Sequence, residues 1–142
     1  MADVTITASM YIKKEKLEYQ SKPTAFTGSI ATSNPKGPVP GAIQVTLEGV
    51  SIDLSELTTP GYCRIINLDD TNFLEYGIWD PEGATFYPLG EVLAGESYPL
   101  RLSRNLQQEY GTGTGTTGAN TNRLRLKADT AALNASVEAF EA

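Results

Sequence analysis

The chain has 142 residues, of which 40% are hydrophobic and 20% charged, and its formal net charge at pH 7 is −6. This length and composition predict one globular domain, 1–142, that can bury a core without disulfides, and they exclude an intrinsically disordered chain. Because phosphate contacts need a footprint of lysine and arginine, the acidic balance argues against binding to nucleic acids and to anionic membranes.

The amino-acid composition also limits the chemistry open to this chain, because it holds no histidine and a single cysteine. Catalysis by Ser-His-Asp or Cys-His groups needs a histidine, and zinc sites need several histidines or cysteines. Cys63 lies among apolar residues, where we expect a small buried side chain and not a reactive thiol. We therefore expect a protein that is not an enzyme and that uses no metal and no other cofactor.

The N-terminal segment predicts a strand followed by a charged turn. From Val4 to Ile12 every second residue is apolar, which is the period of a strand with one buried face. The cluster KKEKLE at 13–18 then predicts a solvated turn or strand end. The opening residues lack a basic region and an apolar run, and no apolar stretch approaches the ~20 residues of a membrane span. We therefore expect neither a signal peptide nor a membrane anchor.

Residues 20–41 contain four prolines and three glycines, which argues against a central strand throughout this segment. We expect an extended arm or a long loop, anchored to a surface by Phe26 and Ile30. A long loop in a small domain is commonly functional. Phe26 and Ile30 are therefore candidate contact residues.

The central region predicts short strands separated by tight turns. These strands lie near 42–48, 62–67, 73–79, 85–92 and 97–102. The intervening run SIDLSEL fits either a strand or one helical turn, because several of its residues can cap a helix. Ala94-Gly95-Glu96 predicts a hairpin connection into the last of these strands. The spacing indicates an all-β, antiparallel sandwich of jelly-roll type.

The C-terminal region begins with a polar segment of low complexity, 105–122, which we expect to be an exposed loop. It lacks the lysine that follows the glycines of a phosphate-binding loop. Alternating residues then predict a strand at Leu124 and Leu126 and another around Val137. If these two strands pair as a hairpin, the basic residues of the first lie near Glu138. A helix over 130–140 is the alternative, because alanine favours helices.

A cationic stripe stands out in this acidic chain: Arg123, Arg125 and Lys127. The simplest interpretation is a solvated strand face. The functional interpretation is a surface that docks on an acidic protein partner. Three charges are too few to indicate a DNA-binding site.

Two further groups of residues raise the question of a ligand. Five carboxylates could hold calcium or act as a glycosidase pair: Asp69, Asp70, Glu75, Asp80 and Glu82. Four aromatic residues could form a sugar-stacking platform: Tyr76, Trp79, Phe86 and Tyr87. However, the run NLDDTN has the composition of a hairpin turn, and half-buried strand positions explain the aromatic residues more simply. We therefore expect structural roles for both groups.

Three segments carry a resemblance to a known family. They are ADVTITASM at the N-terminus, PGYCRIINLDDTNFLEYGIWDPEGATFYPLGEVLAGESYPLRL at 60–102, and ANTNRLRLKADTAALNASVEAFEA at the C-terminus. The middle segment is similar in its N-L-D-x-T-N turn, its F-x-P-L motif and its G-E-x-Y/F-P-L-R-L motif. Together these segments, about half of the chain, resemble the capsid decoration, or cement, proteins of tailed bacteriophages.

The resemblance implies a sandwich bound to the outside of an icosahedral head, where it bridges neighbouring major capsid subunits, often as a homotrimer. Such a protein is made in the host cytoplasm and ends on the capsid surface of the virion. Five residues are then candidate contacts to the major capsid protein: Phe26, Ile30, Arg123, Arg125 and Lys127. The alternatives are a carbohydrate-binding module and another virion part, such as a tail or neck protein.

Overall fold

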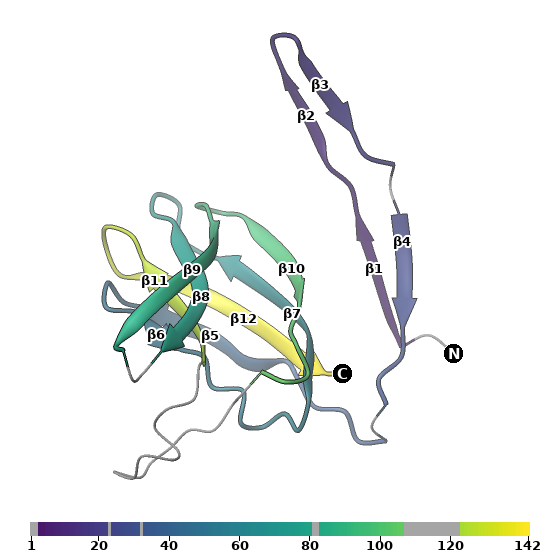
Figure 1. Cartoon of the computed structure of the whole chain (residues 1–142), viewed down its shortest axis with the longest axis vertical. Coiled ribbons are helices and arrows are strands. Elements are labelled where there is room, and N and C mark those ends of the chain that lie inside the picture. The colour runs from purple at the N-terminus through teal and green to yellow at the C-terminus, as the bar shows by residue number, and fades with distance from the viewer. Residues whose placement is uncertain (1–2, 23, 32, 81–82, 107–122) are drawn as a thin grey trace. The chain divides into compact units, whose positions relative to one another are not determined.

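The computed structural model describes residues 3–22, 24–31, 33–80, 83–106 and 123–142, and in these ranges the secondary structure is all β. The chain divides into two compact units, Met1–Ser33 and Asn34–Ala142 (Figure 1). We call the first unit the hairpin and the second unit the body. None of the described residues belongs to a helix long and apolar enough to span a membrane. The predicted loop at 105–122 lies almost entirely outside the described residues.

The hairpin is an antiparallel ribbon made of two ladders. In the outer ladder, β2 (Tyr11–Lys14) pairs with β3 (Leu17–Gln20). In the base ladder, β1 (Val4–Ala8) pairs with β4 (Thr24–Gly28). Between the ladders, the backbone N–H of Met10 donates to Ser21 Oγ at 2.7 Å. The predicted charged turn at 13–18 is the tip of this hairpin, with Glu15 at a φ of 53°.

The segment 20–41, expected to be an arm or loop, contains regular structure at both ends. Strand β4 lies inside it and pairs with β1 without interruption from Thr24 to Gly28. The segment also includes the start of β5 (Val39–Val45). An extended pairing was possible because the run TAFTG contains no proline, whereas the prolines of the segment fall outside β4.

The body is a sandwich of two four-stranded antiparallel sheets. Its further strands are β6 (Val50–Ser51), β7 (Pro60–Asn67), β8 (Leu74–Asp80), β9 (Thr85–Val92), β10 (Ser97–Arg101), β11 (Arg123–Ala128) and β12 (Leu133–Glu141). One sheet has the order β10-β7-β12-β5 and the other has the order β6-β11-β8-β9. The predicted antiparallel β-sandwich is confirmed, and residues 133–141 form a strand and not a helix.

Most turns of the body carry the chain from one sheet to the other. Among consecutive described strands of the body, β8 and β9 are the pair that forms a hairpin. The predicted hairpin at Ala94-Gly95-Glu96 is wrong, because β9 pairs with β8 whereas β10 pairs with β7. The predicted hairpin of the two C-terminal strands is also wrong, because β11 and β12 lie in different sheets. Glu138 instead lies opposite Arg64 of β7, with 3.1 Å between its Oε2 and the Nε of Arg64.

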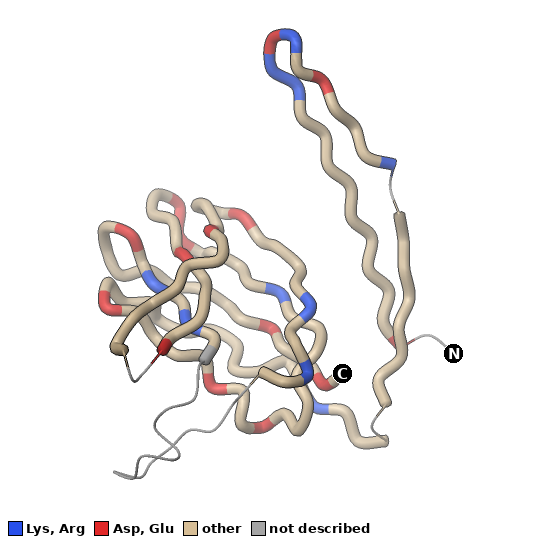
Figure 2. The backbone as a smooth tube through the Cα atoms, in the orientation of Figure 1, with Lys and Arg blue, Asp and Glu red and all other residues tan. Residues whose placement is uncertain are grey.

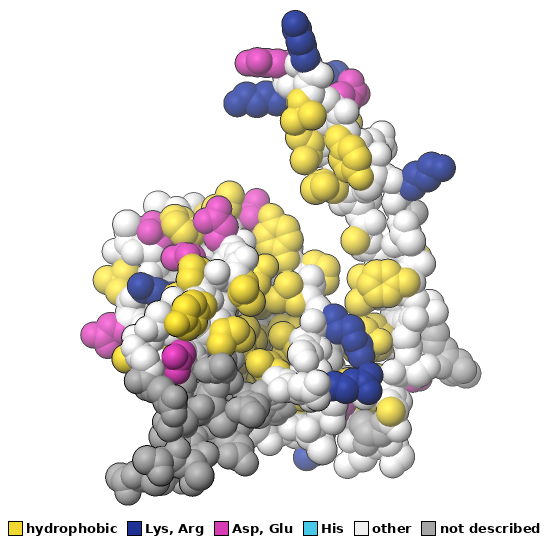
Figure 3. Space-filling view, viewed as in Figure 1, with side chains coloured by type: hydrophobic (Ala, Val, Ile, Leu, Met, Phe, Trp, Pro, Cys, Tyr) yellow, Lys and Arg dark blue, Asp and Glu magenta, His cyan; other side chains and the backbone are white. Residues whose placement is uncertain are grey.

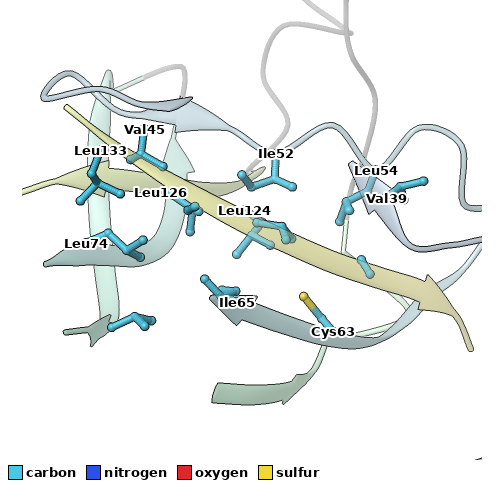
Figure 4. Packing of buried hydrophobic residues seen from close by; sticks show 14 of the residues in the cluster. Val39, Val45, Ile52, Leu54, Cys63, Ile65, Leu74, Leu124, Leu126 and Leu133 are labelled. Carbon is cyan, nitrogen blue, oxygen red and sulfur yellow. The ribbon is translucent and has the colours of Figure 1, made fainter. Parts of the chain in front are cut away.

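Side chains from the two sheets meet in one core. Val45 and Ile65 come from one sheet and Leu74 and Leu126 from the other, and all four are fully buried (Figure 4). Burial of such a side chain stabilises a fold by about 1.5–3 kcal/mol. The alternation of apolar residues in the sequence therefore marks the inner faces of the body correctly.

The run SIDLSEL is neither a strand throughout nor a helix. After the two residues of β6 the chain turns, and the N–H of Leu57 donates to the carbonyl of Leu54 at 2.9 Å. This turn adds three buried side chains to the core: Ile52, Leu54 and Leu57. A buried carboxylate, Glu141, holds the following residues, because its two oxygens accept the N–H groups of Thr58 and Thr59 at 2.9 Å each.

The edges of both sheets are short or contain proline. Edge strands β5, β9 and β10 contain Pro40, Pro88 and Pro99, and the fourth edge strand, β6, has two residues. Because proline has no backbone N–H, it interrupts the row of donors that an edge offers to another strand. The four strands of the hairpin, in contrast, contain no proline.

Cys63 is buried in β7, as the sequence predicts. Burial, with a smaller contribution from the Glu138 carboxylate, raises the pKa of its thiol from 9.0 to about 12. Between these two values the unfolded chain loses the thiol proton while the folded chain keeps it. The stabilising contribution is therefore complete below pH 9 and is lost as the pH rises toward 12.

We expect the free energy of unfolding to fall as the pH rises above about 9, by up to about 1.4 kcal/mol per pH unit between the pKa of the unfolded thiol and that of the folded one. Urea unfolding of the native chain and of Cys63→Ala measures this effect. The variant should lose less stability over the same range, since it has no thiol to titrate. An equal loss in both proteins would contradict the assignment to Cys63.

Candidate interaction surfaces

The outer ladder of the hairpin presents an apolar face. The register places Ile12 opposite Tyr19 and Lys14 opposite Leu17, so these four side chains share one side of the ribbon. Leu17 is 60% exposed and Tyr19 is 49% exposed. Figure 3 shows hydrophobic side chains gathered along the hairpin, next to the charged residues of its tip. We call this surface the tip face; it combines three apolar side chains with one lysine and no carboxylate.

The other side of the outer ladder is more polar. Lys13 lies opposite Glu18, and the Tyr11 hydroxyl donates to the Glu18 carboxylate at 3.5 Å. The negative charge of Glu18 therefore has a lysine and a tyrosine as its cross-strand neighbours. The positive charge of the tip face has no such carboxylate opposite it in the register.

The base ladder holds both contact residues predicted from the proline-rich segment. Phe26 lies opposite Ile6 and is 54% exposed. Ile30 follows β4, and its N–H donates to the Asp3 carboxylate at 3.0 Å. Asp3 in turn donates its own N–H to the carbonyl of Gly28 at 3.0 Å. The structure thus brings Phe26 and Ile30 to the same end of the hairpin.

The hairpin has no core of its own, because none of its described residues is buried. The predicted buried face of the N-terminal strand is therefore wrong: the alternation is present, but no layer within this unit covers it. A two-stranded ribbon without a covering layer is at best marginally stable in water. Its exposed apolar side chains are a candidate surface for a partner.

The predicted cationic stripe on β11 is only in part a surface feature. The Arg125 guanidinium lies 3.9 Å from the ring centroid of Trp79. Its Nη2 also donates to the carbonyls of Glu48 and Gly49, at 3.0 Å and 3.3 Å. Arg125 therefore fastens the turn between β5 and β6 to the sandwich. Lys127 is half-buried and lies opposite Glu75, and the side chain of Arg123 lies outside the described part of the chain.

The aromatic residues of β8 and β9 do not form an open platform. One face of Trp79 carries the Arg125 guanidinium, and the Tyr76 ring lies close over Gly90. Tyr87 is exposed on the edge strand. The nearby open hollow of about 240 Å³ is lined by Glu75, Pro88, Leu89, Gly90 and Glu91, without an aromatic residue. This arrangement counts against sugar stacking on Trp79.

The NLDDTN segment forms a turn held by its own side chains, although it crosses between sheets and does not close a hairpin. Asn67 is buried, and its amide donates to the carbonyls of Asn72 and Val92 at 2.8 Å and 3.0 Å. Its Oδ1 accepts the N–H of Asp69 at 2.9 Å. The N–H groups of Asn72 and Thr71 donate to the Asp69 carboxylate, which lowers its pKa below the ordinary value.

The carboxylates near this turn are not gathered into a metal site. In the ranges that the structure describes, no three side chains of the metal-binding types are placed to hold one ion. Asp69 Oδ1 accepts hydrogen bonds from its own turn, at 2.6 Å and 2.8 Å from the nitrogens of Asn72 and Thr71. The turn chemistry expected from the sequence therefore accounts for Asp69.

Four turns meet at one end of the body: 46–49, 68–73, 93–96 and 129–132 (Figure 1). Hydrogen bonds tie them together. The N–H of Ala128 donates to the carbonyl of Thr46 at 3.0 Å, and the N–H of Asp129 donates to that of Phe73 at 3.2 Å. The N–H of Asn67 likewise donates to the carbonyl of Glu96 at 2.9 Å.

These four turns form an acidic and partly apolar surface, which we call the acidic end. They contain five carboxylates and no lysine or arginine: Glu48, Asp69, Asp70, Glu96 and Asp129 (Figure 2). Three of them also present an exposed leucine: Leu47, Leu68 and Leu93. This surface could not be predicted from the sequence, because its residues come from turns that are up to about 80 positions apart.

Two buried polar residues, Asn67 and Glu141, were also missed, although the sequence holds a signal for both. Cys63, Ile65 and Asn67 alternate on the inner face of β7, and Val137, Ala139 and Glu141 follow one another in the buried positions of β12. A polar residue that continues an inward alternation must find partners inside the fold. In both cases these partners are backbone groups: those of Asp69, Asn72 and Val92 for Asn67, and those of Thr58 and Thr59 for Glu141.

The chain was compared with protein families, curated proteins and solved structures. No family model, no curated protein and no solved structure matches the chain.

Proposed function

We propose that this protein is a structural, non-enzymatic virion component: a decoration protein that binds the outside of an icosahedral phage head and bridges its major capsid subunits. The observation that carries this proposal is the hairpin, a ribbon with exposed apolar side chains, none of whose described residues is buried. Such a ribbon becomes stable and useful when a partner covers it. An attachment protein needs a surface of this kind.

The strand order of the body supports this role. If β5 is counted as the first strand, one sheet has the order 1-8-3-6 and the other 2-7-4-5. We infer an eight-stranded jelly roll from this order, an architecture that is common in viral capsid proteins. Lectin domains share the same architecture, so the hairpin and not the fold distinguishes the proposed function.

In this proposal the capsid contacts come from the base of the hairpin and from β11. Phe26 and Ile30 supply apolar contact, and Lys127 supplies a positive charge for an acidic capsid surface. The other two predicted residues, Arg123 and Arg125, belong to the same strand as Lys127. The partners are the major capsid protein and further copies of the chain, in a homotrimer on the capsid surface. Many weak contacts on one shell then add up to tight attachment.

Undecorated heads assembled from the partner major capsid protein provide the test. We expect the purified protein to co-sediment with undecorated heads and to raise the temperature at which they break open. Phe26→Ser should weaken binding by about tenfold, since it removes an exposed aromatic anchor. Leu89→Ser is the matched control, because Leu89 is 71% exposed on the body. Absence of binding at every salt concentration would overturn the proposal.

A further inference from the structure

We propose that the tip face of one copy docks on the acidic end of a second copy, so that copies associate head to tail. This contact goes beyond the head binding proposed above, which uses the base of the hairpin and β11. It assigns a partner to the two surfaces that the proposed capsid contacts leave unused.

The two surfaces are alike in their apolar content. The tip face offers Ile12, Leu17 and Tyr19, all exposed. The acidic end offers one exposed leucine from each of three turns: Leu47, Leu68 and Leu93. Removing both apolar surfaces from water in one contact therefore lowers the free energy. An apolar centre with a charged rim is the usual composition of a protein interface.

The two surfaces are opposite in charge. Lys14 lies on the tip face, and two further lysines, Lys13 and Lys16, lie within two positions of it in the chain, with Glu15 between Lys14 and Lys16. The acidic end holds five carboxylates and no basic residue. Residues 1–33 contain four basic and three acidic side chains, a net charge of +1, whereas residues 34–142 contain seven basic and fourteen acidic side chains, a net charge of −7. Opposite charges fix the orientation of the partners and speed their encounter.

Charge also selects the head-to-tail arrangement. Two acidic ends that meet face to face would bring ten carboxylates together, twice the five of one copy, and would repel each other. Docking of the hairpin of one copy on the acidic end of another avoids this repulsion. A second copy is the partner we infer, because one chain carries both complementary surfaces and presents them in equal number.

Edge-to-edge pairing of the bodies is a poor alternative. Three of the four edge strands contain proline and the fourth has two residues. The acidic end, in contrast, keeps several side chains exposed, among them Leu47, Leu68 and Leu93. Asp70 is exposed, and its carboxylate accepts one hydrogen bond, from the Thr71 hydroxyl at 2.9 Å. A contact between unlike surfaces generates a closed ring when its rotation closes, which suits the proposed homotrimer.

Sedimentation velocity over a concentration range on the order of 1–100 µM tests the contact. We expect the native protein to sediment faster than a monomer. Tyr19→Ser on the tip face and Leu68→Ser on the acidic end should each weaken association by about tenfold or more. Leu89→Ser, the same chemical change at an exposed leucine on β9, should leave association unchanged. The Leu68 variant tests the contact even if the hairpin variant does not fold.

A charge exchange gives a sharper test. Lys14→Glu and Asp70→Lys should each weaken association, and the chain that carries both substitutions should recover most of it, because opposite charges face each other again. Association of the native chain should also weaken severalfold as the salt concentration rises from about 0.05 M to 0.5 M.

Two results would overturn the contact: a monomer over the whole concentration range, or assembly that none of these substitutions weakens. Head binding is measured separately with the same proteins. A monomer that still binds heads would overturn the contact and leave the proposed function standing. Assemblies that respond to these substitutions but bind no heads would support the contact and overturn the proposed function.

Discussion

Replacement of Asn67 by aspartate is expected to lower the free energy of unfolding by about 3–5 kcal/mol at neutral pH. The native amide donates to the carbonyls of Asn72 and Val92, at 2.8 Å and 3.0 Å, from a position that is 1% exposed. An ionised carboxylate of the same shape cannot donate to either carbonyl. It would instead place a buried negative charge against two carbonyl oxygen atoms.

Asn67→Ala and Asn134→Asp serve as the comparisons. The alanine variant leaves the same carbonyls and the N–H of Asp69 without their partner but adds no charge, so we expect a smaller loss of about 2–3 kcal/mol. Asn134→Asp makes the same chemical change at an exposed site on β12 and should alter stability by less than about 0.5 kcal/mol. Urea unfolding measures all three. An aspartate variant as stable as the alanine variant would contradict this account of Asn67.

Replacement of Gly77 by alanine is expected to destabilise the body by about 3 kcal/mol, as overpacking against a fixed backbone does. The ladder between β8 and β9 shifts its register between Tyr76 and Gly77. This irregularity brings the opposite strand so close that a Cβ atom on Gly77 would overlap the Tyr87 carbonyl and lie 2.8 Å from Pro88 Cα. Both are backbone atoms, so no side-chain movement can relieve the overlap.

Gly95→Ala separates this steric effect from backbone strain. Gly95 has a φ of +74°, but a Cβ atom there would meet nothing within 4 Å. We expect a loss of about 1–2 kcal/mol for Gly95→Ala, from conformation alone. Thermal unfolding and amide exchange across β8 and β9 provide the measurement. If Gly77→Ala cost no more than Gly95→Ala, the close approach of β9 to β8 would not be a constraint on this position.

The positions of the body strands could be predicted from the sequence, but their partners could not. The expected strands at 62–67 and 85–92 agree closely with β7 (Pro60–Asn67) and β9 (Thr85–Val92). Alternation of apolar residues shows which side of a strand faces a core, and it is the same whichever sheet the strand joins. Short turns such as 93–96 then look like hairpin turns even when they connect two sheets.

For the same reason, the sequence does not show what the strands of the hairpin pack against. The alternation from Val4 to Ile12 predicts an apolar side but does not show whether another layer of the same chain covers it. Phe26 and Ile30 were predicted as contact residues and lie at the base of this ribbon. Arg125 was predicted from its charge alone, and its contacts with Trp79 and the Glu48 carbonyl depend on a neighbouring strand and a distant turn.

The prolines at the edges of the sandwich have a consequence for behaviour at high concentration. Edge strands that keep a full row of donors can add further strands without limit and grow into fibrils. Pro40, Pro88 and Pro99 interrupt three such rows, and β6 is too short to offer a fourth. We expect crowded copies of the body to remain discrete particles, free of cross-β growth.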